Sequence, residues 1–193
     1  MRKLCLAPWR TVSPLEVFGG DAGNLIIKWP VLDQALTDHL TGLPNRRAFD
    51  LALTEAVKQA NTQVAGFALI FFDLDYFKQI NDTHGHFVGD DVLRIFAATL
   101  RAAIRQDDFA ARYGGEEFCV LAPAWREAYA IGERVGEAVR DISSPVRFTC
   151  SFGWAAYPQN AGDADELVKV ADGNLYAAKQ AGRNRGYPKP EGG

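Results

Sequence analysis

Apolar residues follow a regular alternation of strand-like and helix-like spacing from residue 38 onward. Residues 67–72 form a continuous apolar run, as expected of a central strand covered on both faces. Further strand-like segments lie at 109–112, 118–121 and 146–156. Helical spacing predicts a helix from residue 46 to about 61, and a second that ends near 105 after a loop holding Gly85, His86 and Gly89. Two more helices are expected at 124 to about 142 and at 163 to about 181.

The order of these elements predicts the fold. It contains a β-α-β-β-α-β unit, which is the ferredoxin-like or palm-type arrangement. We therefore expect an α+β sandwich in which helices flank a central, mostly antiparallel sheet. Asn45 is expected as the N-cap of the first helix, and the sequence Tyr-Gly-Gly-Glu-Glu at 113–117 predicts a β-hairpin turn.

Residues 1–37 differ in composition from the rest of the chain. They are rich in Pro, Gly and Trp, and two short apolar stretches flank a Gly-rich segment at 19–23, which suggests a small hairpin. A segment of this length is too short for an independent domain. We expect an N-terminal arm that packs on the main domain, on a second chain, or on neither. The main domain is expected at 38–186, followed by a flexible tail at 187–193.

Composition excludes several classes of protein. The 193 residues carry 21 Lys and Arg against 24 Asp and Glu, a formal net charge of −3, whereas nucleic-acid-binding domains usually have a clear basic excess. We expect one domain of ordinary size to fill this length, without room for a separate sensor in these 193 residues. No apolar run approaches the roughly 20 residues that span a bilayer, and the first residues lack a secretory signal. We expect a cytoplasmic protein with neither nucleic acid nor membrane as partner, whose cysteines, Cys5, Cys119 and Cys150, are unpaired and buried.

Two acidic clusters carry the strongest chemical signal. Asp73 and Asp75 end the apolar strand, and Glu116 and Glu117 occupy the hairpin turn. If the strand pairs with the hairpin, these carboxylates converge at one edge, where they repel one another unless a cation separates them. Oxygen ligands favour Mg²⁺ or Mn²⁺. The alternative is that strand ends and turns are acidic because they are solvated, but two clusters beside a Gly-Gly pair favour a site.

Basic residues complement these acids. Lys78 follows Asp73 by five residues, and Lys179 and Arg183 lie one turn apart at the end of the last helix. Such charges would stabilise the negative charge that develops on a leaving pyrophosphate. Alternatively, Lys179 and Arg183 only complement the helix dipole.

Five separated motifs resemble those of the GGDEF-domain diguanylate cyclases. They are D-x-L-T-G-L-x-N-R at 38–46, F-D-L-D-x-F-K-x-x-N-D at 72–82, G-H-x-x-G-D at 85–90, R-Y-G-G-E-E-F at 112–118, and D-x-x-L-Y at 172–176 leading to Lys179 and G-R-N at 182–184. The resemblance covers about residues 38–185. The signature here reads G-G-E-E-F, a variant with Glu in place of Asp.

The resemblance implies a reaction and a set of roles. Each domain would bind one GTP, and two domains would meet in a homodimer to form cyclic di-GMP and release two pyrophosphates. Asp73, the Leu74 carbonyl and Glu116 would hold two divalent ions. Glu116 would also accept the 3′-hydroxyl proton, with Glu117 nearby, and Lys78 would assist catalysis.

The remaining motif residues would bind nucleotides. Substrate contacts would come from Asn81, His86 and Asp90 on the guanine side, and from Phe77, Gly114, Gly115, Lys179 and Arg183. An ionised Asp90 can accept from the two N–H donors on the edge of guanine, which adenine does not present. Arg105, Asp108 and Arg134 match the R-x-x-D site at which the product inhibits the enzyme.

Two other functions stay open from the sequence alone. The chain could be a catalytically weak module that binds GTP or cyclic di-GMP without making the product, although it retains the signature acids that degenerate relatives lose. It could also be a cyclase with altered base choice, because a fold does not fix a function.

Overall fold

The computed structural model describes residues 34–63, 65–142, 144 and 146–189. Five strands form one sheet in the order β2-β3-β1-β4-β5. The central strand β1 (Phe67–Leu74) pairs antiparallel with β3 (Glu117–Ala122) on one side and with β4 (Cys150–Tyr157) on the other. β2 (Phe109–Gly114) pairs antiparallel with β3, whereas the short β5 (Gly186–Tyr187) runs parallel to β4. The prediction of a mostly antiparallel α+β sheet is confirmed.

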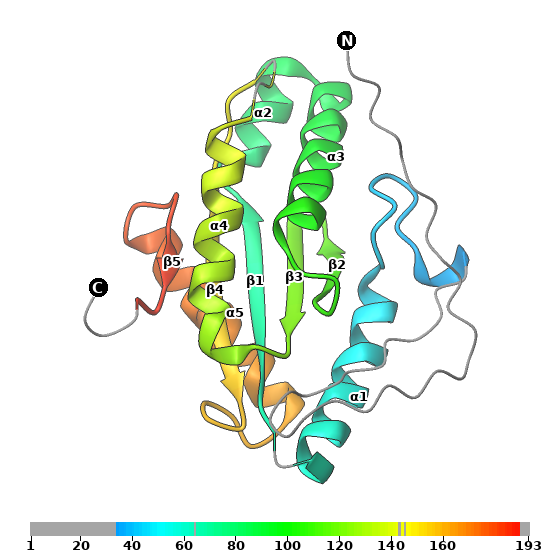
Figure 1. The fold of residues 1–193 in the computed structure, drawn as a ribbon. Helices are drawn as coiled ribbons and strands as arrows, with labels where there is room; N and C mark the ends of the chain where they lie inside the picture. Colours follow the sequence, from blue (N-terminus) through cyan, green and yellow to red (C-terminus); the bar gives the residue numbers. More distant parts are fainter. Residues whose placement is uncertain (1–33, 64, 143, 145, 190–193) are drawn as a thin grey trace.

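Helices cover both faces of this sheet (Figure 1). α2 (Phe77–His84), α3 (His86–Ala103) and α4 (Ala128–Arg140) pack on one face, and α1 (Arg46–Gln63) and α5 (Ala164–Gln180) pack on the other. Two 3₁₀ turns, η1 (Gln34–Leu36) and η2 (Trp125–Glu127), precede α1 and α4. In the described ranges no helix is both long and apolar enough to cross a membrane.

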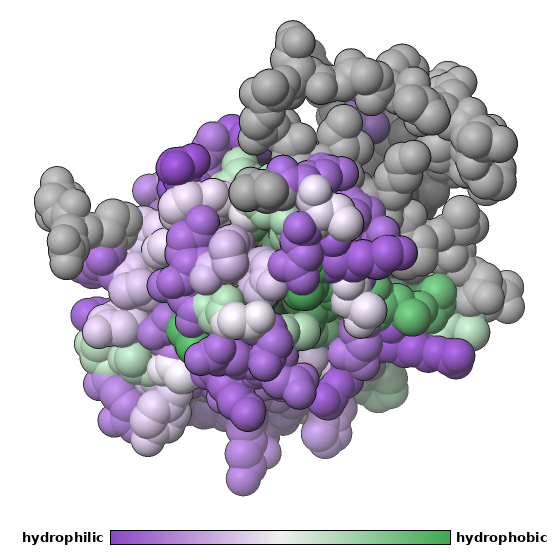
Figure 2. Space-filling view, turned by 90° about the horizontal axis from the view of Figure 1, so that it is seen from below, coloured by the Kyte–Doolittle hydropathy of each residue, from purple (hydrophilic) through white to green (hydrophobic). Residues whose placement is uncertain are grey.

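The central strand divides the core into two layers. Successive side chains of a strand point to opposite faces, so Ile70 and Phe72 pack with α2, α3 and α4, while Leu69 and Phe71 pack with α1 and α5. Every residue of β1 is buried, which explains its unbroken apolar run. On the face seen in Figure 2, hydrophilic residues dominate the described surface and apolar residues form smaller areas between them.

Asn45 caps the first helix as predicted, and Asp163, at which the last helix was expected to begin, caps that helix. Asn45 Oδ1 accepts a hydrogen bond from the Ala48 amide at 3.1 Å, and Asp163 Oδ1 accepts one from the Glu166 amide at 2.8 Å. Each satisfies an amide that lacks a partner within its helix. Both helices therefore begin where the sequence predicted.

The segment after β1 was predicted wrongly as a loop. It contains α2, and α3 already begins at His86, so that Gly89 lies inside a helix. Gly85, with φ of +83°, separates the two helices. Gly89 is needed for close packing rather than for a turn, because a Cβ there would lie 1.9 Å from Asn81 Oδ1. α2 is short and mostly polar, and it gave no clear periodic signal.

Other boundaries also differ from the predictions. The strand expected from residue 146 begins only at Cys150, and the helix expected from 124 begins as η2 and ends at Arg140. Most of the predicted arm (residues 1–33) and the end of the tail (190–193) lie outside the described residues.

Candidate active site

The end of β1 and the β2–β3 turn meet at one edge of the sheet. The register places Asp73 opposite Glu117, and the Leu74 amide donates to the carbonyl oxygen of Glu116 at 3.3 Å. The pairing expected between the apolar strand and the hairpin is therefore present. It brings the carboxylates of Glu116 and Glu117 close enough to Asp73 for their negative charges to act on it.

The surroundings of Asp73 raise its pKa. Its side chain is buried, and Lys179 Nζ lies 2.7 Å from its Oδ2 atom. Burial raises the pKa of Asp73 to about 6; the hydrogen bond and charge of Lys179 oppose this shift, while the negative charges of Glu116 and Glu117 add to it. The structure thus joins the end of α5 to the acidic edge, a contact that the spacing of the basic residues did not specify.

The donor chemistry of this edge fits a hard divalent cation. Its side chains offer carboxylate oxygens, the ligands that Mg²⁺ and Mn²⁺ prefer, and their mutual repulsion is what such an ion would relieve. In the part of the chain that the structure describes, no three acidic, His or Cys side chains are already arranged around a common metal position. Lys179 supplies the positive charge beside Asp73.

Asp75 does not join this cluster, contrary to the prediction. Its Oδ2 atom accepts from Thr149 Oγ1 at 2.6 Å and from the Asn184 amide at 3.0 Å, and its Oδ1 atom accepts from Ser151 Oγ at 2.7 Å. The strand ends at Leu74 and the next residue but one, Tyr76, has a φ of +57°. Strand alternation therefore no longer places Asp75 beside Asp73, and its carboxylate ties the C-terminal loop to β4.

Arg112, a residue of the motif at 112–118 for which the sequence predicted no role, holds the hairpin turn. Arg112 donates through Nε and Nη2 to the carbonyl oxygen of Gly115, at 3.1 and 2.7 Å. Its Nη1 atom lies 3.1 Å from both oxygens of Asp38. Asp38 Oδ1 also accepts from the amide and hydroxyl of Thr41, at 2.9 and 2.6 Å. A chain of polar contacts thus links the first motif to the turn that carries Glu116.

The pKa of Asp38 reports the same network. Partial burial raises the pKa, but the hydrogen bonds from Thr41 and the charge and hydrogen bond of Arg112 outweigh it, so that the pKa lies below its ordinary value. At neutral pH Asp38 is therefore a stable anion. Gly115, with φ of +22°, adopts a conformation that side chains disfavour, which accounts for glycine in the turn.

The residues predicted on the guanine side lie on two consecutive helices. Asn81 belongs to α2 and packs against Gly89, while His86 and Asp90 lie in the first turns of α3. Asn81 and Asp90 are half-buried, and His86 is exposed. Phe77, predicted to contact substrate, is only 8% exposed and belongs to the core.

The other predicted cations take different positions. Lys78 is exposed in the first turn of α2. Arg183 follows α5 with a φ of +60°, and its guanidinium lies 4.6 Å from the centre of the Tyr76 ring. The loop after α5 is therefore in contact with the β1–α2 turn.

The R-x-x-D residues gather at the C-terminal end of α3. Asp108 Oδ2 accepts from the Arg105 amide at 2.9 Å, and Arg134 Nε donates to the carbonyl oxygen of Ala103 at 2.5 Å. Burial raises the pKa of Asp108, partly opposed by Arg105 and Arg134. The Arg105 guanidinium pairs with Glu127 at 2.5 Å. The three predicted residues are neighbours, on the side of β2 and β3 away from α5.

A mostly antiparallel sheet with acids at the end of β1 and on the next hairpin defines a palm-type nucleotide cyclase fold. Comparison with known proteins makes the class specific, because residues 35–185 match the family model "Diguanylate cyclase, GGDEF domain". The chain belongs to this GGDEF diguanylate cyclase family.

Individual relatives agree with this assignment. The chain is 43% identical over 162 residues to the diguanylate cyclase DgcP of Pseudomonas aeruginosa, covering 79% of this chain and 24% of DgcP. It is 40% identical over 162 residues to the response regulator PleD of Caulobacter vibrioides, covering 79% of this chain and 36% of PleD. This chain therefore spans less than half the length of these two relatives.

A solved structure supports the same fold. The crystal structure of the coiled coil and GGDEF domain of DgcB from Caulobacter crescentus, in complex with c-di-GMP, superposes with a TM-score of 0.73. The sequence identity is 34%, and the match covers 78% of this chain and 84% of the DgcB chain.

Proposed function

We propose that this protein condenses two molecules of GTP into cyclic di-GMP and releases two pyrophosphates. The observation that carries the proposal is the acidic edge: Asp73 faces the Gly-Gly-Glu-Glu turn and pairs with Lys179 of α5. Family membership and the relatives named above support the same reaction. Residues 38–186 would form the catalytic unit.

Each bond-forming step joins the 3′-oxygen of one GTP to the α-phosphorus of another. The bond from that phosphorus to the pyrophosphate breaks, and the pyrophosphate leaves with the bonding electron pair. Glu116 accepts the proton of the attacking 3′-hydroxyl, assisted by the charge of Glu117. Because the described chain has one such acidic edge, two copies must meet face to face to bring both nucleotides together.

Basic side chains neutralise the triphosphate. Lys179 contacts Asp73 at this edge, and we infer that Arg183 of the loop after α5 and Lys78 of α2 add their charges to it. Fixed positive charges of this kind stabilise charge that develops on the leaving group. Asn81, His86 and Asp90 hold the guanine, and the two glycines of the turn let the backbone approach the phosphates.

Asp73, the Leu74 carbonyl and Glu116 would hold the divalent ions, Mg²⁺ or Mn²⁺, two for each active site. When bound, such ions orient the phosphates and stabilise charge on the attacking and leaving oxygens. Burial raises the pKa of Asp73 to about 6, so its carboxylate is mostly ionised, and able to bind a cation, above that pH.

The product would inhibit the enzyme at Arg105, Asp108 and Arg134. The Arg105 guanidinium would leave Glu127 to bind a phosphate or a guanine of cyclic di-GMP through a paired hydrogen bond. The cost of breaking this exposed ion pair is small.

Product formation measured against protein concentration tests the proposal. With GTP and Mg²⁺, the specific activity should rise with concentration because the reacting form is a dimer. Glu116→Gln should abolish turnover and leave folding and GTP binding intact. GTP binding by the wild type without any cyclic di-GMP at high protein concentration would refute the cyclase function and favour a nucleotide-binding module.

A further inference from the structure

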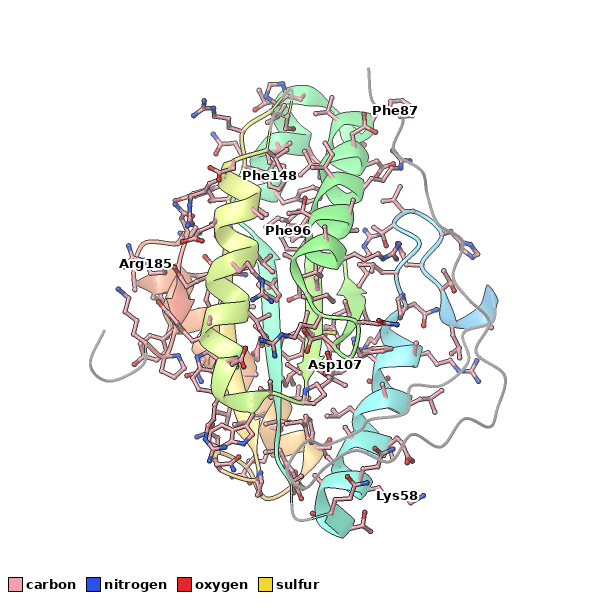
Figure 3. All side chains as sticks on the ribbon, viewed as in Figure 1. Lys58, Phe87, Phe96, Asp107, Phe148 and Arg185 are labelled. Atoms are coloured by element: carbon pink, nitrogen blue, oxygen red, sulfur yellow. The ribbon has the colours of Figure 1, made fainter. Side chains whose placement is uncertain are left out.

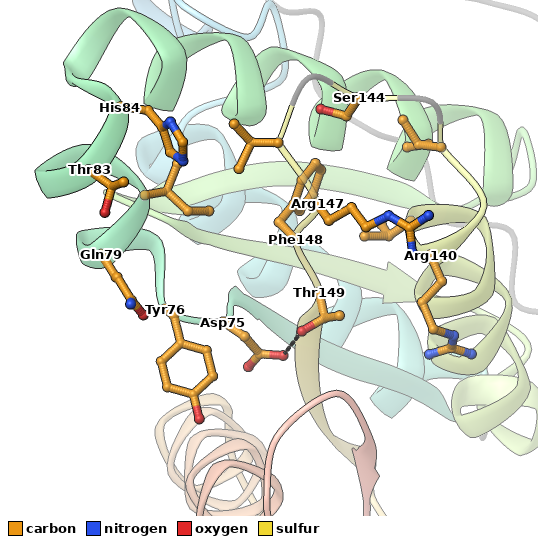
Figure 4. Close-up of a pocket in the computed structure, with 14 residues that line it drawn as sticks. Asp75, Tyr76, Gln79, Thr83, His84, Arg140, Ser144, Arg147, Phe148 and Thr149 are labelled. Carbon is orange, nitrogen blue, oxygen red and sulfur yellow. Dashed lines mark hydrogen bonds between the residues drawn. The ribbon is translucent and has the colours of Figure 1, made fainter.

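A pocket of about 550 Å³ lies beside the β1–α2 turn, and its lining includes none of the three carboxylates of the acidic edge. This volume is typical of sites for small molecules. α2 forms one wall, and the end of α4 and the segment leading to β4 form the opposite wall (Figure 4). Asp75 and Thr149 lie at its base. None of the residues assigned above to catalysis, GTP, metal or product lines it.

Two arginines give this pocket its positive charge. Arg140 and Arg147 lie on one side, and the imidazole ring of His84 lies on the other (Figure 4). Among the described residues, neither arginine forms an ion pair with a carboxylate. Asp75, the acid at the base, has both oxygens engaged in hydrogen bonds. The charges available to an occupant are therefore cationic.

The rest of the lining combines apolar and polar groups. Ile80, Val139 and Phe148 are at most 8% exposed and form a continuous part of the core behind the pocket. Gln79 and Thr83 of α2 add side-chain donors and acceptors along the rim. An occupant that uses this lining needs an anionic end, a flat apolar body and polar atoms at its edge.

We propose that this pocket binds a small organic phosphate that carries a flat ring, of the nucleoside monophosphate class. The phosphate contacts Arg140 and Arg147, whose planar guanidinium groups suit phosphate oxygens. The ring lies against Ile80 and Phe148, and its polar edge faces Gln79 and Thr83. The volume accommodates a single nucleotide.

The pocket is connected to the proposed GTP site through one turn. Tyr76 lines the pocket, and the guanidinium of Arg183 packs over its ring, 4.6 Å from the ring centre. Arg140 Nη1 donates to Asn184 Oδ1 at 3.1 Å. An occupant therefore contacts the segment that positions Arg183. The consequence rests on the proposed function: occupancy changes the affinity for GTP, and GTP changes the affinity for the occupant by the same factor.

Binding of adenosine 5′-monophosphate, measured by calorimetry on the whole chain without GTP, tests the pocket. This probe has the required phosphate and ring, while Asp90 disfavours adenine at the proposed guanine site. Arg147→Glu should weaken binding by about tenfold or more. Thr83→Trp should block the pocket, and circular dichroism checks that the variant is folded. Inorganic phosphate and adenosine should each bind more weakly than the monophosphate.

Lys58→Glu is the matched control, because it makes the same change in charge at an exposed position on α1. Figure 3 shows Lys58 at the far end of the molecule from Phe148. This variant should bind like the wild type. The proposal is overturned if the wild type does not bind the probe at millimolar concentration, or if Arg147→Glu and Lys58→Glu bind equally well. Loss of binding in Asp90→Ala together with full binding in Arg147→Glu would assign the probe to the GTP site instead. Because cyclic di-GMP synthesis is assayed separately, either proposal can fail alone.

Discussion

Removing the ion pair between Asp38 and Arg112 should destabilise the fold and disable the hairpin turn. The two side chains are only 22% and 16% exposed, and 74 residues separate them in the sequence. Arg112 also donates twice to Gly115. Arg112→Met keeps an apolar stem of similar length but removes every one of these donors.

The strength of the Asp38–Arg112 interaction follows from the burial of both side chains and from the geometry of their contact. Hydrogen bonds to charged groups contribute about 1.5–3 kcal/mol when shielded from solvent, whereas exposed ion pairs contribute about 0.2–1 kcal/mol. We therefore expect a coupling free energy of about 2 kcal/mol in a double-mutant cycle of Asp38→Ala and Arg112→Met. With a urea m-value of about 2 kcal/mol per molar, the midpoint shifts of the two single variants should add up to about 1 M more than the shift of the double variant.

Urea unfolding of the wild type, both single variants and the double variant measures the coupling. The matched control is the Asp91–Arg94 pair of α3, which has a similar contact distance of 2.8 Å but side chains that are 66% and 51% exposed. Asp91→Ala with Arg94→Met should give about 0.5 kcal/mol or less. Equal coupling energies for the two pairs would refute the idea that shielding gives the Asp38–Arg112 pair its strength.

The same network predicts a pH dependence and an effect on activity. Because the pKa of Asp38 is lowered on folding, its contribution is fully present above its unfolded pKa and is lost as the pH falls through the native value. The stability difference between the wild type and Asp38→Asn should therefore shrink below about pH 4.

Arg112→Met should reduce kcat by about 100-fold through displacement of Glu116, with little change in GTP affinity. An unchanged kcat would show that the turn needs no such support.

Three further predictions concern other parts of the fold. Gly153→Ala should lower the free energy of unfolding by about 3 kcal/mol, because the new Cβ would lie 1.9 Å from the Leu175 amide nitrogen of α5; a wild-type urea midpoint would contradict this packing. Asp75→Ala should lower the free energy of unfolding by about 3 kcal/mol, because it removes the acceptor of three hydrogen bonds. A loss of metal affinity without a loss of stability would instead show that Asp75 acts with the acidic cluster. Cys119 and Cys150 should resist alkylation in the folded protein, since both are buried and burial raises both thiol pKa values; rapid labelling of either peptide, detected by mass spectrometry, would be inconsistent with the core described.

Much of the fold could be predicted because its signals are local. The apolar run of β1 marks a strand buried on both faces, and the caps at Asn45 and Asp163 mark helix starts within one turn of chain. The exception was the segment from Tyr76 to Gly89. There α2 is short and polar, and its packing against Gly89 depends on a contact between two helices rather than on spacing within one.

The candidate site, like the fold, was predicted correctly only in part. The sequence indicated that Asp73 would meet Glu116 and Glu117, because strand pairing follows from the order of the elements. It wrongly grouped Asp75 with them, because the direction of this side chain changes when the backbone leaves the strand at Leu74. Periodicity holds only as far as the regular element extends.

By itself, the sequence determined the element order, the motifs and the residue types that the proposed chemistry needs. The tertiary structure alone decided that Lys179 reaches Asp73, that Arg112 joins Asp38 to the Gly115 carbonyl, and that a cationic pocket lies beside the β1–α2 turn. The physical reason is the distance along the chain over which each effect acts. Backbone preferences and side-chain periodicity act over a few residues, whereas contacts between distant residues depend on how packed helices and strands bring their ends together.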